Sequence, residues 1–333
     1  MTSRKSIVVA GAGSIGCFVG GMLASVGHKV ALLARPRIIS EISKNGLRLT
    51  SFEGLDRHVT ADRLLMSDAS SIFSGADIVL VTVKSADTAA MAQEIARHAP
   101  ADATVVSLQN GVSNAAILRD ALDGRRVLSG MVPFNVISLG EGRFHRATSG
   151  DIAIEQDAAG TAEQLSIPEL MMRPTANMLG VQWGKLLLNL NNALNALSGL
   201  PLREQLSQRQ WRCLLADQMG EALVAMRADG IVPVSSTPIP ASLAPYLLRL
   251  PDALFRLLAG RTIKIDPQAR SSMWEDLQRH RLTEIDYLQG VIIGIAAKHG
   301  LQVPLTRRIV DLIKNAERRG EGSPGLTPAQ IRG

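Results

Sequence analysis

The chain has 333 residues, enough for two domains of ordinary size. Hydrophobic residues at 46% and charged residues at 20% are typical of globular proteins and exclude a disordered chain, while aromatic residues at 3% leave little surface for stacking nucleic-acid bases. The net charge of +6 fits either attraction of anionic small molecules or a generic arginine-rich surface, and no basic arm indicates a nucleic-acid partner.

The cysteines and the N-terminal residues indicate in which cellular compartment the protein is expected. The two cysteines, Cys17 and Cys213, lie far apart, and neither they nor the six histidines are spaced like metal ligands. The apolar run at the N-terminus leads directly into a glycine motif, so we interpret it as a first strand rather than a signal peptide. No apolar stretch approaches the roughly 20 residues that span a bilayer. We therefore expect no metal, no membrane partner and a reducing, cytoplasmic location.

The first half of the chain alternates short β-branched runs with helical patterns. Several runs are continuously apolar, which suits parallel strands buried on both faces, and they cover residues 7–10, 30–33, 78–83, 104–108 and 127–132. Helical patterns lie between most of them, for example at residues 87–99 and 113–121. This alternation predicts an α/β fold with a doubly wound sheet of the Rossmann type. Residues 134–156 contain glycine turns and are expected to complete that sheet as antiparallel strands.

After residue 178 the pattern becomes almost entirely helical. Long helices are predicted at residues 181–197, 208–229, 271–297 and 304–318, with a glycine- and proline-containing loop at residues 230–240. The last residues, 320–333, are expected to form a mobile tail. The predicted organisation is a Rossmann domain over residues 1–178 and an all-helical domain over residues 179–333.

A GxGxxG motif lies between the first predicted strand and the following helix. In this setting the first glycine permits a tight turn, the second lets the backbone approach a pyrophosphate, and the third lets the helix pack on the strand. The helix N-terminus adds unpaired amides and a positive dipole for the phosphates. The alternative is a glycine-rich turn without a ligand. The predicted dinucleotide-binding residues are Gly11, Ala12, Gly13, Ser14, Ile15 and Gly16.

Arg35 follows the second predicted strand and bears on the choice of cofactor. It lies 19 residues after Gly16, where NAD-specific folds usually carry a carboxylate that binds the ribose 2′-hydroxyl. A carboxylate would repel a 2′-phosphate, whereas a guanidinium group binds it bidentately. Arg35, with Arg37 nearby, therefore predicts NADP(H) rather than NAD(H). The alternative is that both arginines lie on an exposed loop without a ligand.

A polar stripe interrupts an apolar helix in the second half. Lys185, Asn189 and Asn192 recur at positions i, i+4 and i+7, which share one helix face. Lysine is rarely buried without a role, and a buried asparagine needs partners. The stripe predicts a ligand cleft, and a solvent-facing stripe on an amphipathic helix is the alternative. A second polar cluster covers residues 271–287, but its charges alone are typical of helical surface.

Five ordered motifs together resemble the ketopantoate reductase (2-dehydropantoate 2-reductase) family over nearly the whole chain. They are GAGSIG at residues 11–16, VTVK ending at Lys84, QNG centred on Asn110, WGKLLLN around Lys185, and SSMWEDLQRHRLTEID at residues 271–286. The resemblance implies a Rossmann domain followed by a helical domain, with ketopantoate bound between them. It also implies NADPH-dependent reduction of ketopantoate to pantoate, the reductive step towards pantothenate and coenzyme A.

The resemblance also implies roles for individual residues. By motif, Lys185 matches the catalytic lysine and Glu284 the active-site glutamate, while Asn110, Asn189 and Ser272 match substrate contacts. Lys84 matches a basic residue near the cofactor and substrate, and Asn110 is expected beside the cofactor as well. In such a reaction NADPH would deliver a hydride to C2 of a 2-oxo acid, and Lys185 would stabilise the developing oxyanion and donate its proton. Glu284 would orient Lys185 or accept a hydrogen bond from a substrate hydroxyl.

Two positions depart from the family pattern. Ala193 and Ala269 stand where the family often has substrate-facing asparagines, and Asn192 or Asn195 are the candidates to compensate. The departure favours, as an alternative, reduction of a different branched or hydroxylated 2-oxo acid. A non-catalytic NADP-binding sensor is a further alternative, which the presence of both Lys185 and Glu284 disfavours. The apolar helices of the second half also predict a homodimer, although packing within one chain explains the same pattern.

Overall fold

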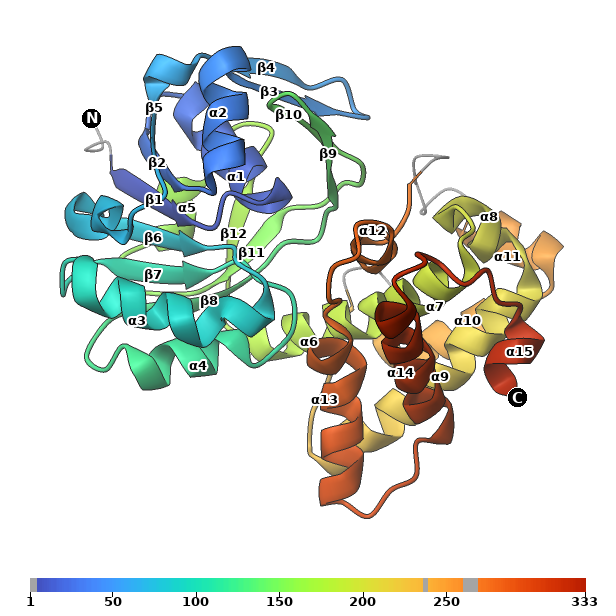
Figure 1. Ribbon diagram of the computed structural model, residues 1–333. Coiled ribbons are helices and arrows are strands. Elements are labelled where there is room, and N and C mark those ends of the chain that lie inside the picture. Colours follow the sequence, from blue (N-terminus) through green and yellow to red (C-terminus); the bar gives the residue numbers. More distant parts are fainter. Residues whose placement is uncertain (1–4, 236–238, 260–268) are drawn as a thin grey trace. The chain divides into compact units, whose positions relative to one another are not determined.

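The computed structural model describes residues 5–235, 239–259 and 269–333. The chain divides into two compact units, Met1–Met178 and Leu179–Gly333. Figure 1 shows strands and helices in the first unit and helices in the second. In the described ranges, every helix is too short or too polar to cross a bilayer.

An eight-stranded sheet forms the centre of the first unit, in the order β12-β11-β8-β7-β6-β1-β2-β5. Its strands are β1 (Ser6–Ala10), β2 (Lys29–Leu33), β5 (Leu64–Ser67), β6 (Ile78–Val81), β7 (Thr104–Ser107), β8 (Val127–Met131), β11 (Ile152–Glu155) and β12 (Met172–Thr175). All neighbours from β5 to β8 are parallel, whereas β11 pairs antiparallel with β8. The parallel part has the Rossmann order, in which the direction of winding reverses between β1 and β6. The predicted fold class is confirmed.

Helices cover both faces of this sheet, which explains the continuously apolar strands. They are α1 (Ser14–Ser25), α2 (Pro36–Asn45), α3 (Thr88–His98), α4 (Asn114–Ala121) and α5 (Thr161–Leu165), with short 3₁₀ turns at Ala61–Arg63, Ser70–Gly75 and Ser85–Asp87. Along β1, Ile7 and Val9 join the core that includes α1, while Val8 joins the opposite core with Ile95 of α3. Successive side chains of the strand point to opposite faces, and both faces are buried.

A second sheet of four strands lies in the same unit, in the order β4-β3-β10-β9. Its strands are β3 (Leu47–Ser51), β4 (Asp56–Val59), β9 (Val136–Gly140) and β10 (Arg143–Arg146). The expectation that residues 134–156 complete the main sheet was therefore wrong for β9 and β10, and only β11 joins that sheet. The reason is a long-range pairing in which β10 runs parallel to β3, with Phe144 opposite Leu49, and both side chains are buried in the α1 core.

The described residues of the second unit contain helices and loops only. The helices are α6 (Met178–Asn189), α7 (Asn191–Ser198), α8 (Leu202–Ser207), α9 (Arg209–Ala228), α10 (Ala244–Leu248), α11 (Asp252–Ala259), α12 (Ser272–Gln278), α13 (Ile285–Lys298), α14 (Pro304–Arg319) and α15 (Pro328–Arg332), with a 3₁₀ turn at Ala241–Leu243. The predicted helices at 208–229 and 304–318 are confirmed as α9 and α14.

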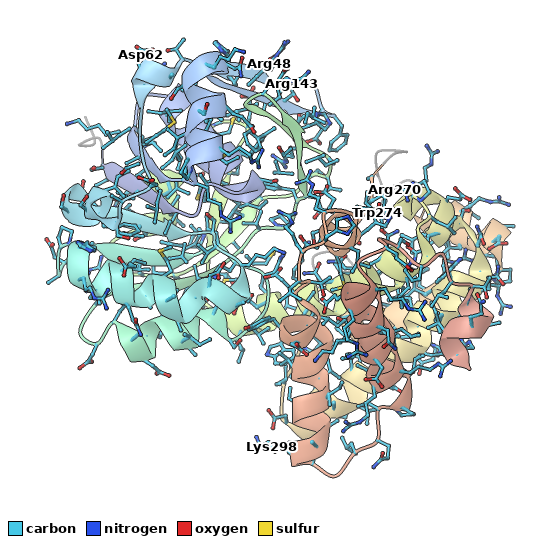
Figure 2. All side chains as sticks on the ribbon, viewed as in Figure 1. Arg48, Asp62, Arg143, Arg270, Trp274 and Lys298 are labelled. Carbon is cyan, nitrogen blue, oxygen red and sulfur yellow. The ribbon has the colours of Figure 1, made fainter. Side chains whose placement is uncertain are left out.

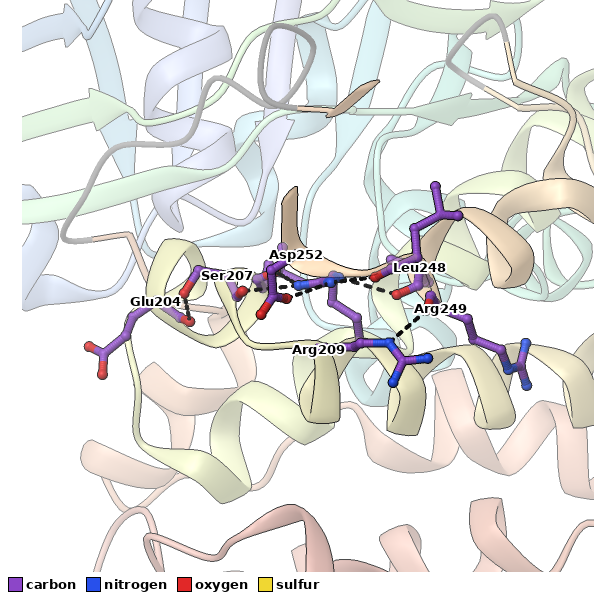
Figure 3. Close-up of polar contacts among 9 residues, drawn as sticks. Glu204, Ser207, Arg209, Leu248, Arg249 and Asp252 are labelled. Atoms are coloured by element: carbon purple, nitrogen blue, oxygen red, sulfur yellow. Dashed lines mark hydrogen bonds and ion pairs between the residues drawn. The ribbon is translucent and has the colours of Figure 1, made fainter. Parts of the chain in front are cut away.

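A buried arginine joins α8, α10 and α11 to α9. The Arg212 side chain has 0% exposure, and its guanidinium donates hydrogen bonds to four backbone carbonyls and to one Asp252 carboxylate oxygen, 2.8 Å away. The group also lies 4.1 Å above the centre of the Phe255 ring. Nearby, Arg209 donates to the carbonyl of Arg249 (Figure 3). Arg212 has a structural role, because its charge is balanced by backbone dipoles and one carboxylate inside the unit.

The predicted helix at residues 271–297 is two helices, α12 and α13, separated by residues 279–284. In this connection His280 has a positive φ of 51°, and the backbone N–H and hydroxyl of Thr283 both donate to Glu317 of α14. A carboxylate from another helix thus takes the place of a helical carbonyl at Thr283. As a result Glu284 lies at the N-cap of α13 rather than within a continuous helix.

The C-terminal residues are packed, so the expectation of a mobile tail was wrong. Ser323 donates to the carbonyl of Ala196, and the N–H of Leu326 donates to that of Leu197. Thr327 and Gln330 then form a reciprocal capping box at the start of α15, whose Ile331 is buried. The capping box satisfies the first amides of this short helix, and Ile331 anchors it to the core.

Candidate active site

The glycine motif forms the turn between β1 and α1, and its three glycines meet different constraints. Gly11 has a positive φ of 107°, and a Cβ atom there would lie 2.9 Å from the backbone N of Val83. A Cβ atom at Gly16 would lie 2.2 Å from the carbonyl oxygen of Gly11. By contrast, apart from its chain neighbours, no described atom lies within 4 Å of a Cβ at Gly13, where φ is −80°. The fold itself does not require glycine at 13, so the open space there fits a ligand that approaches the backbone closely.

The surroundings of this turn suit an anion. Helix α1 begins at Ser14 with Gly13 as its N-cap, and its first turn carries no acidic residue. Thr82, directly after β6, donates a 2.6 Å hydrogen bond to the carbonyl of Gly11 and so ties the turn to the neighbouring strand. Because the order of the sheet reverses between β1 and β6, this is the edge where open α/β sheets bind ligands. The site thus fits the diphosphate of a dinucleotide at a helix N-terminus.

The other predicted residues of the first unit lie at the same, carboxyl edge of the sheet. Arg35 follows β2 at the N-cap of α2, is exposed, and makes no side-chain hydrogen bond or ion pair within the described ranges. Arg37, in contrast, pairs with Glu41 on α2. Lys84 follows β6 and Asn110 follows β7, and both are half-buried. The carboxyl ends of adjacent parallel strands therefore bring these predicted cofactor residues to one edge.

In the second unit, Lys185 and Asn189 lie one turn apart on α6. Asn189 is only 6% exposed, and its amide makes no hydrogen bond with other described residues. Burial lowers the pKa of Lys185 from 10.5 to about 8. The segment after α9 crosses α6 at Gly184, where a Cβ atom would lie 1.8 Å from the carbonyl oxygen of Val234. Gly184 thus lets the chain after α9 run directly across α6, beside Lys185.

The long helix predicted at 181–197 is divided at Leu190 into α6 and α7. The carbonyl of Leu190 accepts a 3.0 Å hydrogen bond from the amide of Gln289, a fully buried residue of α13. This contact joins the end of the helix that carries Lys185 to the helix that begins after Glu284. Sequence patterning did not single out Gln289, because an apolar helix with one glutamine gives no sign of a distant partner.

Hydrogen bonds with residues of α7 hold the start of α12 in place. Ser271 is buried at the N-cap, where its hydroxyl oxygen accepts from the N–H of Trp274 and its hydroxyl donates to the carbonyl of Asn192. The amide of fully buried Asn195 accepts from the N–H of Ser271 and donates to Leu200 and Gln205. Asn195 is therefore engaged within the unit and does not compensate for a missing substrate amide. Sequence analysis missed this structural role of Asn195 and Ser271.

Ser272 itself is exposed, as the first residue of α12. Residues on either side of it in the sequence contact each other, because the guanidinium of Arg270 lies 4.4 Å above the ring of Trp274 (Figure 2). Arg270 also donates to the carbonyl of Gly199. Ala193 and Ala269, the two departures from the family pattern, are both buried.

The described residues show neither a metal-ligand cluster nor a disulfide. Across residues 5–235, 239–259 and 269–333, no group of three His, Cys, Asp or Glu side chains could hold a metal ion. Both cysteines are free, and burial raises the pKa of Cys17 to about 12, so this thiol is a poor nucleophile.

Comparisons with known proteins agree with this architecture. The family model described as ketopantoate reductase PanE/ApbA matches residues 7–158, and its C-terminal counterpart matches residues 177–317. A 2-dehydropantoate 2-reductase from Halobacterium salinarum is 29% identical over 94% of this chain and 99% of that protein. Another from Pyrococcus horikoshii is 27% identical over 95% of this chain and 99% of that protein.

Solved structures give the same result. A PanE/ApbA family ketopantoate reductase from Ralstonia eutropha is 32% identical, with a TM-score of 0.80 over 95% of this chain and 99% of that one. D-Mandelate dehydrogenase, solved with NADH and anilino(oxo)acetate, shares the fold at 21% identity with a TM-score of 0.78, over 95% of this chain and 99% of that one. The predicted resemblance is thereby confirmed, and the chain belongs to the ketopantoate reductase PanE/ApbA family of oxidoreductases.

Proposed function

We propose that the protein reduces ketopantoate (2-dehydropantoate) to pantoate with NADPH, the reductive step towards pantothenate and coenzyme A. The observation that carries this proposal is the polar face of α6, where the desolvated Lys185 lies one turn from Asn189. The nearly buried Asn189 amide has no hydrogen-bond partner among the described residues, so it is available to a ligand. The names of the relatives, 2-dehydropantoate 2-reductases, support the choice of substrate.

Lys185 has the properties of a general acid for this reaction. Its pKa of about 8 keeps the amine mostly protonated at neutral pH, yet makes it a stronger acid than an exposed lysine. As an ammonium group it would stabilise negative charge on the C2 oxygen and then donate its proton there. Glu284, at the N-cap of a helix tied to the end of α6, would orient Lys185 or accept a hydrogen bond from a substrate hydroxyl. Asn110, Asn189 and Ser272 would donate hydrogen bonds to the substrate.

The first unit would hold the cofactor. The turn from Gly11 to Gly16 would bind the diphosphate, Arg35 the ribose 2′-phosphate, and Lys84 with Asn110 the part nearer the substrate. A nicotinamide cofactor is implied by family membership, and when bound it supplies the hydride for C2. The preference for NADP(H) rests on Arg35, whose guanidinium is exposed and unpaired within the described part of the chain.

Reduction of a different 2-oxo acid is the second candidate. Ala193 and Ala269 contribute only buried methyl groups at two positions where the family often provides amides. A substrate with fewer hydroxyl groups would need fewer such partners, because a site without a hydrogen-bond donor gains little from a polar substrate group.

Two further expectations concern the protein in the cell. A ketopantoate reductase from Staphylococcus aureus is described as dimeric, which supports our prediction of a homodimer. The free cysteines are compatible with the expected cytoplasmic location, where thiols stay reduced.

Steady-state NADPH oxidation tests the proposal. Ketopantoate would be compared with its analogue that lacks only the hydroxyl group, 3,3-dimethyl-2-oxobutanoate, and with a small panel of other 2-oxo acids, with NADH in parallel. We expect the highest kcat/KM for ketopantoate with NADPH. Turnover of only another 2-oxo acid would favour the second candidate, and tight NADPH binding without any turnover would reject the reductase and favour a sensor.

A further inference from the structure

The loops that follow β6 and β7 are joined by a network of buried polar side chains. Five residues form it, and none is more than 6% exposed: Ser85, Thr88, Ser107, Gln109 and Asn114. The first two lie in the segment from the end of β6 to the first residue of α3, and the other three in the segment from the last residue of β7 to the first residue of α4. Lys84 and Asn110 lie within the same two loops, so the network surrounds both predicted site residues of this edge.

Gln109 makes the first link between the loops. Its amide nitrogen donates to the carbonyl of Val83, at 3.1 Å, and to the hydroxyl oxygen of Thr88, at 2.7 Å. Its amide oxygen accepts a 3.0 Å hydrogen bond from Ser107 on β7. The carbonyl of Val83 belongs to the peptide group that leads into Lys84, so this amide fixes the backbone orientation directly before Lys84.

Asn114 makes the second link. Its amide oxygen accepts a 2.9 Å hydrogen bond from the hydroxyl of Thr88, and its amide nitrogen donates to the hydroxyl oxygen of Ser85, at 3.1 Å. The same nitrogen donates to the carbonyl of Asn110, at 2.5 Å, which also accepts from Ser85 at 3.2 Å. The side chain of Ser85, directly after Lys84, and the backbone carbonyl of Asn110 are thereby held by one amide.

The hydrogen bonds run in one direction from Ser107 through Gln109, Thr88 and Asn114 to the carbonyl of Asn110. Every hydroxyl in this series of hydrogen bonds acts as a donor, and the oxygen and nitrogen of both side-chain amides form hydrogen bonds. Burying so many polar groups is costly unless all are paired, and apolar side chains would fill the same space without that cost. What hydrogen bonds add is a fixed relative geometry of two loops, which packing alone specifies less sharply.

We infer that Thr88, Gln109 and Asn114 are positioning residues that set the relative placement of Lys84 and Asn110. This inference rests on the proposed role of Lys84 and Asn110 in binding the nicotinamide side of the cofactor and the substrate. The diphosphate turn and Arg35 follow other strands, β1 and β2, and no hydrogen bond of the five network side chains reaches them within the described residues. Loosening the network should therefore impair turnover without weakening binding of the adenosine side.

Thr88 offers the sharpest variants, because its hydroxyl both accepts from Gln109 and donates to Asn114. Thr88→Val keeps the shape and removes the hydroxyl, whereas Thr88→Ser keeps the hydroxyl. We expect Thr88→Val to lower kcat/KM for the oxo acid by about 10- to 100-fold, since small displacements of positioning groups have effects of this order. Thr88→Ser should retain activity to within about threefold, because the hydrogen bonds persist. The Kd of 2′,5′-ADP, a probe of the diphosphate turn and Arg35, should be unchanged in both variants.

Two aligned serines provide a matched control. Ser107 of β7 and Ser129 of β8 are register partners, with exposures of 1% and 6%, but Ser129 accepts from Arg119 and is outside the network. Ser107→Ala should lower turnover, whereas Ser129→Ala should leave it at the wild-type level. Wild-type kcat/KM in folded Thr88→Val, equal losses in both serine variants, or a parallel loss of 2′,5′-ADP affinity would each overturn the inference.

The failure of the proposed function would be recognised separately. If the wild-type protein turns over no 2-oxo acid, the reductase proposal falls, and NADPH binding alone tests the network. Thr88→Val should then weaken NADPH binding while 2′,5′-ADP binding stays unchanged. Equal NADPH affinities of the wild-type protein and Thr88→Val would contradict the positioning role.

Discussion

Lys185, the proposed general acid, would be costly for folding and useful for chemistry. It lies on a mostly apolar helix, and its pKa is lowered to about 8 because burial disfavours the charged form. The same desolvation makes the ammonium group a better proton donor near neutral pH. The lowered pKa of Lys185 is therefore expected to appear both in the reaction and in the stability of the protein.

The pH dependence of the reaction should reveal Lys185. Reduction needs the protonated amine, so kcat/KM for the oxo acid should be level below pH 8 and fall as the pH rises above about 8. Oxidation of the hydroxy acid needs the neutral amine and should increase over the same range. Initial rates in both directions across pH 6–10 measure this. A reductive rate that does not fall until pH 10 would contradict the assignment.

The free energy of unfolding should also depend on pH through Lys185. It should rise with pH, whereas a lysine with a raised pKa would make it fall. The pKa of Lys185 is lower in the folded protein than in the unfolded chain, so the unfolded chain binds more protons between about pH 8 and 10.4. The free energy of unfolding should rise with pH through this window, and the full cost is present below pH 8. Lys185→Met should therefore raise Tm at pH 7. A lower Tm, measured by thermal unfolding against wild type, would contradict the net cost to folding that we assign to Lys185.

Arg35 is the residue on which the cofactor preference depends. Arg35→Asp replaces a group that attracts a 2′-phosphate with one that repels it and accepts from a ribose 2′-hydroxyl. We expect kcat/KM with NADPH to fall by about 10- to 10²-fold, as the loss of a charge-assisted hydrogen bond of roughly 1.5–3 kcal/mol implies. The value with NADH should rise. Arg37→Ala is the control, since Arg37 pairs with Glu41, and an equal loss there would contradict the assignment to Arg35.

At the scale of elements, the turn between β1 and α1 contains two glycines that meet different requirements. Gly16 is required by packing, because a Cβ atom would clash with the carbonyl of Gly11, whereas Gly13 faces open space. Gly16→Ala should therefore lower Tm by several degrees, as expected for a clash of about 1–3 kcal/mol.

Gly13→Ala should leave Tm at or above the wild-type value but weaken NADPH binding by at least about tenfold, because a methyl group would occupy the space left for the diphosphate. Thermal unfolding and NADPH titration of the two variants measure these effects. A Gly13→Ala protein with wild-type NADPH affinity would contradict the dinucleotide role of the turn.

Elements defined by local pattern were predictable from the sequence, and elements defined by distant partners were not. The apolar runs of β1, β2 and β7 and the helices α3 and α9 follow from periodicity, because both faces or one face must be buried. At the break between α6 and α7 the carbonyl of Leu190 accepts from Gln289, 99 residues away, and beyond the end of α12 Thr283 donates to Glu317 of another helix. The short strands β3 to β5 have too little apolar alternation to stand out, and pairing with β10 defines β3.

Within the candidate site, residue types were more predictable than their surroundings. The sequence predicted the glycine turn and the Lys185–Asn189 face, because each has a spacing with a local physical meaning. It did not predict the network around Gln109, since serine, threonine and amide side chains are common in exposed loops as well. The sequence could not tell whether Asn195 binds a substrate or stabilises the fold. The structure shows that its side chain forms hydrogen bonds with Ser271 and Gln205.

At the scale of the whole molecule, each unit carries a separate part of the proposed chemistry. The first unit provides the glycine turn, Arg35, Lys84 and Asn110 at one sheet edge, and the second provides α6 with Lys185. Family models match both units, and the matched relatives are covered over almost their full length. The comparisons thus support an oxidoreductase built from both units rather than a cofactor-binding domain alone.

The most direct test of this account is the rate of NADPH oxidation on addition of ketopantoate, for the wild-type protein and for Lys185→Met, with NADPH affinity measured alongside. We predict turnover by the wild type and a loss of about 10²- to 10⁴-fold in kcat for the variant, the usual contribution of a positioned general acid. NADPH affinity should be retained, because the proposed cofactor residues belong to the first unit. Equal turnover by the two proteins would contradict the central role of Lys185.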